Sequence, residues 1–377
     1  MAGIYLHIPF CRQACHYCNF HFSTSMKGKN DFIPALLKEM EARTDYIAGE
    51  SVSTIYFGGG TPSLLEPDQL DTIVRRLSVL FQLESQAEIT LEANPDDITP
   101  DRLAAWKRSG INRLSIGVQS FFEADLRWMN RAHDARQALD CIGLAQRAGF
   151  QNLSIDLIYG GPTLPDSHWK QNVDQALSLG IPHLSCYALT VEPRTALDHL
   201  IRTNQVHDVD PGDQARQFLL LMDWAAAARY EQYEISNFAL PGHRSRHNAS
   251  YWQGCSYLGL GPSAHSFNGR SRQWNVANNA AYIAAIIDGR GTAVAEREEL
   301  TPVQQLNEYI MISLRTVEGS SYRAIAQRFG PGPAEQLWRR AERYMTTGKI
   351  RTSADVLQLT NEGKLLADGI AADLFFD

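Results

Sequence analysis

Short apolar runs alternate with longer amphipathic stretches over the first two hundred residues of the chain. The short runs are rich in β-branched and aromatic residues, which favours strands. They are "GIYLHIPF", "VSTIYFGGG", "AEITLEANP", "NRLSIGVQS", "NLSIDLIYG" and "PHLSCYALTVE". The stretches between them repeat apolar residues at helical spacing. They cover residues 31–47, 67–81, 99–110, 135–149 and 167–180.

Strands that alternate with helices predict a parallel sheet covered by helices. Six such units favour a partial (β/α)6 barrel of the TIM type, and a doubly wound α/β sheet is the alternative. After residue 200 the alternation stops, and an irregular stretch rich in glycine, aromatic residues and histidine covers residues 233–267. The last part is mostly helical and contains a short hairpin, as in winged-helix domains. We expect a barrel over 1–200, an extension over 201–298 and a smaller, mainly helical winged-helix-like domain over 299–377.

Polar or glycine-rich residues follow each of the six predicted strands. Active sites of such barrels lie at the carboxyl ends of the strands. Six polar strand ends in register therefore indicate a functional site. In strand order they are a cysteine cluster, Gly58 to Pro62, Glu92 with Asn94, Gln119, Asp156, and Thr190 with Glu192.

Composition narrows the class of protein. Hydrophobic residues make up 44% and charged residues 20% of the 377 positions, as in ordinary globular proteins. The net charge of −7 argues against a nucleic-acid partner. No apolar run is long enough to span a membrane, and no signal peptide precedes the first strand. We therefore expect a cytoplasmic, reducing location, in which six cysteines do not form a disulfide framework.

Three of the cysteines, Cys11, Cys15 and Cys18, lie in "CRQACHYC" with the spacing C-x₃-C-x₂-C. A structural zinc site needs four ligands, so zinc is the alternative only if His16 or His21 completes the set. A [4Fe–4S] cluster usually takes four thiolates, and three leave one iron with an open position. An open position is where a ligand binds.

The cysteine spacing resembles that of the radical S-adenosylmethionine (SAM) superfamily. The resemblance implies a [4Fe–4S] cluster on the three cysteines, with the amino and carboxylate groups of SAM on the open iron. The runs "YFGGGTPS", "EANPDD", "RLSIGVQSF", "MNRAHD" and "SIDLIYG" resemble the coproporphyrinogen III oxidase-like branch. By that resemblance, the positions that contact SAM are Tyr5, Tyr17, Gly59, Gly60, Thr61, Glu92, Gln119, Arg131 and Asp156.

Two kinds of protein in this branch compete. The oxygen-independent coproporphyrinogen III oxidases add a fourth cysteine where this chain has Phe20, and they carry a longer arm than the ten residues before Cys11. We therefore expect no oxidase activity. The run "HNASYW" resembles the H-N-x-x-Y-W motif of the haem chaperones of the HemW family. We therefore expect a haem chaperone, and the oxidase is the alternative. That resemblance implies that haem binds at His247, Asn248, Tyr251 and Trp252.

His247 is the expected axial ligand of the haem iron, with His243 and His265 as alternatives, and Arg244 or Arg246 would pair with the propionates. The other interpretation of the motif is an aromatic corner of the core. We expect the stretch to close over the barrel mouth beside the cluster.

The resemblance also implies partners: haem, haem-accepting proteins, an electron donor for the cluster and a haem-linked homodimer. It further implies a cytoplasmic protein that is peripheral at the inner membrane when it delivers haem.

Overall fold

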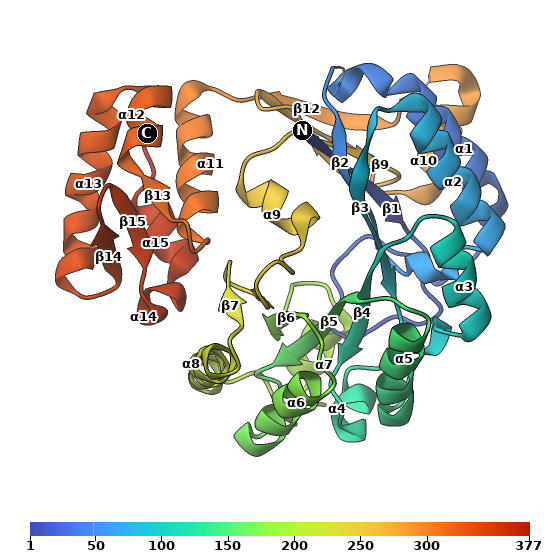
Figure 1. Cartoon of the computed structure of the whole chain (residues 1–377), viewed down its shortest axis with the longest axis horizontal. Helices are drawn as coiled ribbons and strands as arrows, with labels where there is room; N and C mark the ends of the chain where they lie inside the picture. Colours follow the sequence, from blue (N-terminus) through green and yellow to red (C-terminus); the bar gives the residue numbers. More distant parts are fainter. Residues whose placement is uncertain (48, 291) are drawn as a thin grey trace.

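The computed structural model describes residues 1–47, 49–290 and 292–377, and it contains the expected parallel barrel (Figure 1). The six predicted strands are confirmed, and each pairs in parallel with the next along the chain. They are β1 (Ala2–Ile8), β2 (Val52–Gly59), β3 (Leu83–Ala93), β4 (Arg113–Gln119), β5 (Asn152–Tyr159) and β6 (His183–Ala188).

Helices connect these strands and bury their apolar sides against the sheet (Figure 1). The amphipathic spacing predicted the five longer helices between the strands, and the short helix α4 was not predicted because its six residues are too few for a periodic pattern. Two further helices, α7 and α8, follow β6. The helices are α1 (Lys29–Ala42), α2 (Pro67–Leu80), α3 (Pro100–Arg108), α4 (Glu123–Trp128), α5 (Ala135–Arg147), α6 (Asp166–Ser178), α7 (Ala196–Arg202) and α8 (Pro211–Ala227).

The sheet continues beyond both ends of the six-strand array. β9 pairs in parallel with β1, and β10, β11 and β12 follow it in antiparallel order. On the other side β8 pairs antiparallel with β6, and β7 with β8. The added strands are β7 (Glu231–Gln232), β8 (Asn237–Ala239), β9 (Tyr257–Leu260), β10 (His265–Phe267), β11 (Ser271–Asn275) and β12 (Val294–Glu299).

The prediction of an irregular stretch over 233–267 is wrong, because it contains β8, α9 (Arg246–Trp252), β9 and β10. The glycine in "YLGL" gives β9 a weak strand signal on its own. Pairing with β1 overrides that signal. A side chain at Gly259 has no room there, since a Cβ would lie 2.0 Å from the carbonyl oxygen of His265.

The last part of the chain is a helical unit with its own cluster of buried apolar side chains. The expected hairpin, β14 with β15, is present and is followed by helices. Its elements are α11 (Pro302–Leu314), β13 (Ser320–Ser321), α12 (Tyr322–Phe329), α13 (Pro331–Thr346), β14 (Ile350–Ser353), β15 (Val356–Leu359), α14 (Asn361–Lys364) and α15 (Ala367–Asp373). α10 (Asn279–Ala285) lies earlier, beside α1. Within the described residues, no helix combines the length and the apolar character that crossing a membrane requires.

Candidate cluster and SAM site

A cavity of about 440 Å³ opens at the carboxyl ends of the parallel strands. The polar strand ends therefore meet, as the pattern predicted. The cavity brings together most of the predicted site residues, from the cysteine loop, from the ends of β2 to β5 and from the segment after α4. These residues are Cys11, Cys15, Tyr17, Cys18, Gly59, Gly60, Thr61, Glu92, Gln119, Arg131 and Asp156.

The cysteine loop connects β1 to α1, and its three thiols are free and partly buried. Burial raises the pKa of Cys18 to about 11. The two histidines of the zinc alternative are engaged elsewhere: the Nδ1 atom of His16 lies 2.8 Å from the Trp128 carbonyl oxygen, and Nε2 of His21 lies 2.7 Å from Oδ1 of Asn279. Among the described residues, no three His, Cys, Asp or Glu side chains converge on a single metal ion. The loop offers three thiols to the cavity, and neither His16 nor His21 is among the residues that line it.

The glycine-rich turn after β2 lies directly against the exit of β1. Gly59 has a φ of +105°, and a Cβ there would lie 2.7 Å from the His7 ring. A Cβ at Gly60 would lie 2.8 Å from the carbonyl oxygen of Phe10. The Thr61 hydroxyl donates to Sγ of Cys11 over 3.3 Å. Only glycine permits this close approach of backbone to backbone, and the result fixes the turn beside the first cysteine.

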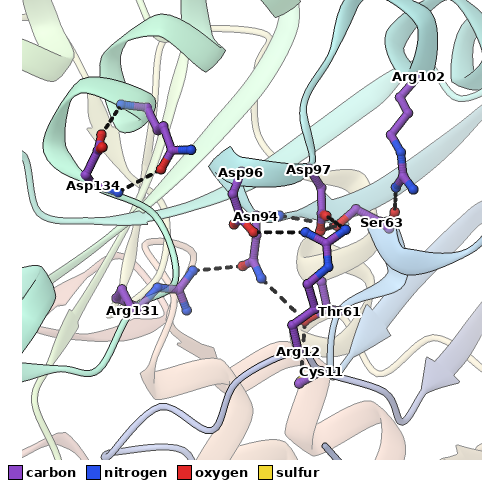
Figure 2. Close-up of polar contacts among 11 residues, drawn as sticks. Cys11, Arg12, Thr61, Ser63, Asn94, Asp96, Asp97, Arg102, Arg131 and Asp134 are labelled. Carbon is purple, nitrogen blue, oxygen red and sulfur yellow. Dashed lines mark hydrogen bonds and ion pairs between the residues drawn. The ribbon is translucent and has the colours of Figure 1, made fainter. Parts of the chain in front are cut away.

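Arg131 connects the cysteine loop to the opposite strands, and Figure 2 shows its hydrogen bond to Asn94. Its guanidinium donates to Sγ of Cys15 over 3.2 Å, to Oδ1 of Asn94 over 2.8 Å and to the carbonyl oxygen of Gly117 over 2.9 Å. Burial alone would lower the pKa of Arg131, but the neighbouring Tyr17 and Cys15 raise it. Its buried Nε atom has no hydrogen-bond partner within the described residues. A fixed positive charge beside a thiol suits an anionic group at this position.

Two carboxyl groups face the cavity from β3 and β5. Burial, followed by repulsion from Asp156, raises the pKa of Glu92 to about 8. Burial also raises the pKa of Asp156 to about 6. The Tyr56 hydroxyl donates to Oε1 of Glu92 over 2.8 Å, and Ser115 donates to Oδ1 of Asp156 over 3.3 Å. Carboxyl groups held in this way suit ligand hydroxyls or a cationic ligand.

Gln119 ends β4 in a left-handed conformation, with a φ of +67°, where the register with β5 shifts. A non-glycine residue in this region carries backbone strain, and such strain is concentrated at functional sites. The side chain is buried and lines the cavity.

The remaining predicted residues lie below the cavity or away from it. Tyr5 is on β1 and stacks on Tyr56, with ring centroids 6.1 Å apart. His247 is only 1% exposed. Its Nδ1 lies 2.8 Å from the Thr54 hydroxyl and its Nε2 lies 2.9 Å from the Tyr251 hydroxyl. Both ring nitrogens are therefore occupied, and burial lowers the pKa of His247 to about 3.

The expectation that the motif closes over the barrel mouth is wrong. α9 lies against the amino-terminal halves of the strands, where the backbone N–H of His247 donates to Oε1 of Glu88 over 3.1 Å. Figure 1 shows α9 between the barrel strands and α11. The motif lies there because the His247 ring packs on those of Tyr5 and Tyr56, and the Tyr251 ring packs on that of His247.

The outer residues of the motif face the helical unit. The Arg315 guanidinium lies 5.4 Å from the centre of the Trp252 ring. Asn248, one helical turn before Trp252 on α9, is partly buried. The two arginines expected for propionates already have partners. Arg244 pairs with Glu231 and Glu318, and Arg246 donates to the carbonyl oxygen of Gln86.

Sequence reasoning missed Tyr56, Ser115 and Tyr187 as site residues. Ser115 and Tyr187 line the cavity, and Tyr56 holds Glu92 from below. A signal existed for Tyr56. Alternate residues of a strand face the same side, so Tyr56 shares the inward face of β2 with Gly58, at the position paired with Tyr5.

Comparisons with known proteins agree with this geometry. Residues 5–176 match the family model of the radical SAM superfamily, and residues 300–366 match that of the HemN C-terminal domain. The solved structure of the coproporphyrinogen III oxidase HemN from Escherichia coli is 25% identical and matches with a TM-score of 0.85, over 99% of this chain and 90% of that one. Fold and site together therefore define a radical SAM protein.

Two curated relatives show which family of the radical SAM superfamily the chain belongs to. The "Heme chaperone HemW" of Bacillus subtilis is 32% identical over 98% of both chains. The protein of the same name from Mycobacterium tuberculosis is 34% identical over 99% of this chain and 94% of its own. The chain belongs to the HemW family.

The residues present fit the cofactors that the superfamily implies. Three thiols without disulfide partners face one cavity, and the glycine turn lines the same cavity beside the first of them. The unpartnered Nε of Arg131 is a buried donor at the same place.

Proposed function

We propose that this protein is a haem chaperone that carries a [4Fe–4S] cluster and SAM in the cavity and passes haem to acceptor proteins. The observation that carries the proposal is the similarity to HemW relatives over nearly the whole chain, with three cysteines and Phe20 in the cluster loop. Phe20 is 69% exposed at the rim of the cavity and provides no ligand there.

Each group of residues has a distinct task in this proposal. Cys11, Cys15 and Cys18 hold the cluster, and Arg131 balances its charge and orients the SAM carboxylate. The glycine turn accepts the SAM amino group through backbone atoms. Glu92 and Asp156 bind the ribose hydroxyls, while Tyr5, Tyr17, Thr61 and Gln119 complete the enclosure. The bound cofactors supply one-electron reduction of a sulfonium.

Haem binding is proposed near "HNASYW". Because His247 is buried and hydrogen-bonded, it can bind iron only after a local rearrangement. Ligation of iron by one ring nitrogen of His247 requires the hydrogen bond at that nitrogen to break, to Thr54 or to Tyr251, at about 1–3 kcal/mol for the buried group left unpaired. His265 is the competing ligand, because its exposed imidazole stacks on Trp274 with ring centroids 5.6 Å apart. The same rearrangement is needed for the other predicted haem contacts, which are Asn248, Tyr251 and Trp252.

Haem titration followed by transfer tests the proposal. The Soret band is followed as haem is added to the wild-type protein, to His247→Gln and to His265→Ala, and the loaded protein is then mixed with apomyoglobin as a probe acceptor. We expect saturable binding, release to the acceptor and loss of affinity in the variant that removes the ligand. Wild-type protein without saturable haem binding would refute the chaperone function.

The second candidate is an oxygen-independent coproporphyrinogen III oxidase, favoured by the similarity to HemN over 99% of the chain. An anaerobic assay with SAM, a strong reductant and coproporphyrinogen III separates the two. We expect no protoporphyrinogen. Product that depends on Cys11 would make the oxidase the better assignment.

Three further parts of the proposal concern the electron donor, the oligomeric state and the location in the cell. An external electron donor reduces the cluster, and haem links two copies of the chain into a dimer, which size-exclusion chromatography with and without haem tests. The protein is cytoplasmic and becomes peripheral at the inner membrane during delivery, which fractionation of cells tests.

A further inference from the structure

Four rings form a continuous stack beneath the cavity. The His247 ring lies 5.0 Å from that of Tyr56 at an interplanar angle of 23°, and 6.5 Å from that of Tyr5 at 27°. The Tyr251 ring meets His247 edge-on at 5.0 Å. The stack crosses from α9, through the barrel interior, to the inner faces of β1 and β2. We define these four residues as the floor stack.

Two glycines make space for the floor stack. A Cβ at Gly3 would lie 3.0 Å from Oγ1 of Thr54 and 3.3 Å from Cε1 of His247. A Cβ at Gly58 would lie 2.9 Å from the rings of both Tyr5 and Tyr56, and 3.1 Å from Oε1 of Glu92. Packing this tight transmits a change of shape rather than absorbing it.

The floor stack ends on a residue of the cavity wall. The Tyr56 hydroxyl donates to Oε1 of Glu92 over 2.8 Å, and Glu92 lines the cavity. His247 in turn is held from three sides, by Thr54, by Tyr251 and through its backbone by Glu88. The position of the Tyr56 ring therefore depends on a histidine ring that is itself fixed.

We infer that His247 is a positioning residue for the SAM site: it supports Tyr56, which orients the Glu92 carboxyl toward the ligand. The inference rests on the SAM-binding part of the proposed function and not on its haem-binding part. It assigns the inner half of the "HNASYW" motif, His247 and Tyr251, to the SAM site. The motif thereby links the SAM site to the helical unit, because Trp252 on the same helix contacts Arg315 of that unit.

A double-mutant cycle on SAM affinity tests this chain of contacts. The variants are His247→Gln, Tyr56→Phe and the double variant, each reconstituted with its cluster. SAM is titrated against the EPR signal of the reduced cluster, and iron content is measured in parallel. We expect each single change to weaken SAM binding about tenfold, which corresponds to about 1.4 kcal/mol. We expect the double variant to be no weaker than the weaker single one, since both changes break the same link.

The matched control is Gln253→Ala, which changes an exposed residue at the end of the same helix. It should leave SAM affinity and iron content at the wild-type level. Wild-type SAM affinity in His247→Gln together with a loss in Tyr56→Phe would overturn the inference. Losses that multiply in the double variant would also overturn it.

Gentler variants decide the question if His247→Gln fails to hold a cluster. Tyr251→Phe and Thr54→Val each remove one hydrogen bond from the His247 ring and keep the ring itself. We expect about a threefold loss of SAM affinity in each, with iron content unchanged. Unchanged SAM affinity in both variants would overturn the inference.

The pH dependence of SAM binding gives a readout that a merely structural defect would not move. The Tyr56 hydrogen bond lowers the pKa of Glu92 against the larger effects of burial and Asp156. Weakening it should therefore shift the pH of half-maximal SAM affinity upward in both Tyr56→Phe and His247→Gln. The titratable groups around Glu92 that stay unchanged in both variants are Tyr5, Tyr187, Tyr251, Asp156 and Cys11.

The haem titration of the same variants separates this inference from the proposed function. If the wild-type protein binds SAM but no haem, the chaperone function fails and the role of His247 stands. If haem binding is normal and His247→Gln keeps its SAM affinity, the function stands and the inference fails.

Discussion

The cysteine loop lines the cavity and the floor stack lies beneath it, and the donor atoms of the two regions differ in how many neighbours they bind. The three thiols of the loop are partly buried; Thr61 donates a hydrogen bond to Cys11, and Arg131 donates one to Cys15. In the floor stack, both ring nitrogens of His247 are taken up by neighbours. A motif rich in potential ligands is therefore not in itself a ligand set. A side chain can act as a ligand only if its donor atoms are not already hydrogen-bonded within the protein.

The largest expected effect comes from the loop. Cys15→Ala leaves two thiolates, which cannot hold a cubane, so the iron content should fall from about four per chain to almost none. Cys255→Ala is the control, because that thiol is also partly buried but lies outside the cavity. Iron analysis and the visible absorbance of the reconstituted proteins measure the difference. A full iron content in Cys15→Ala would remove the loop as the cluster site.

The second prediction concerns Arg131, whose hydrogen bonds join the cysteine loop to the opposite strands. Arg131→Lys keeps the charge but cannot reach Cys15, Asn94 and Gly117 together, because an ammonium lacks the fork of the guanidinium. We expect SAM affinity to fall about thirtyfold, or about 2 kcal/mol, and the cluster to be lost faster to a chelator. The exposed Arg127, which pairs with Glu123, provides the control variant Arg127→Lys. Equal behaviour of the two variants would contradict this role.

The third prediction concerns Glu92, which lines the cavity above the floor stack. Its substitution should change both the stability of the protein and its SAM affinity. Its pKa in the folded protein is raised to about 8 from 4.5, so the folded state favours the protonated form. The SAM-free protein therefore loses stability as the pH rises from about 5 to 8. Glu92→Gln removes that loss and should stabilise the SAM-free protein at pH 8 by about 2 kcal/mol, while SAM binding weakens more than tenfold.

Thermal unfolding of the cluster-loaded proteins at pH 5 and at pH 8 measures the stability effect. The difference between wild type and Glu92→Gln should be small at pH 5 and should grow toward pH 8. A difference that is the same at both pH values would show that ionisation of Glu92 is not its cause.

The smallest expected effect lies where α9 meets the helical unit. Arg315→Ala removes the contact with the Trp252 ring, which is worth about 0.5–1 kcal/mol at a partly exposed site, and the ion pair with the exposed Asp368, which adds little. We expect a drop of that size in the free energy of unfolding, measured in urea, and SAM affinity within twofold of the wild type. A larger loss of SAM affinity would show that the floor stack depends on the helical unit as well as on α9.

The sequence predicted the barrel and the cavity because both rest on local signals. Each of the strands β1 to β6 is an apolar run of its own, and residues such as Glu92 and Asp156 follow from their place at a strand end. The cysteine spacing is likewise local. Domain boundaries at 200 and 298 stay a prediction.

The position of the "HNASYW" motif could not be predicted from local sequence signals. It depends on contacts between residues far apart in the chain, such as His247 with Thr54 and with Gly3. The strand β9 exists because β1 offers it a partner, and no pattern in its own residues reveals that. Periodicity shows which side chains are inward, but it does not show what fills the space inside a barrel.

The most direct test of the account is whether SAM binds the cluster that the three cysteines hold. Pulsed EPR on the reduced, reconstituted protein, with SAM carrying nitrogen-15 in its amino group, measures this contact. We expect a nitrogen-15 coupling to the cluster in the wild-type protein and in Gln253→Ala, and a weaker population of the coupled form in His247→Gln at the same SAM concentration. A reduced cluster without any nitrogen-15 coupling at saturating SAM would contradict the account.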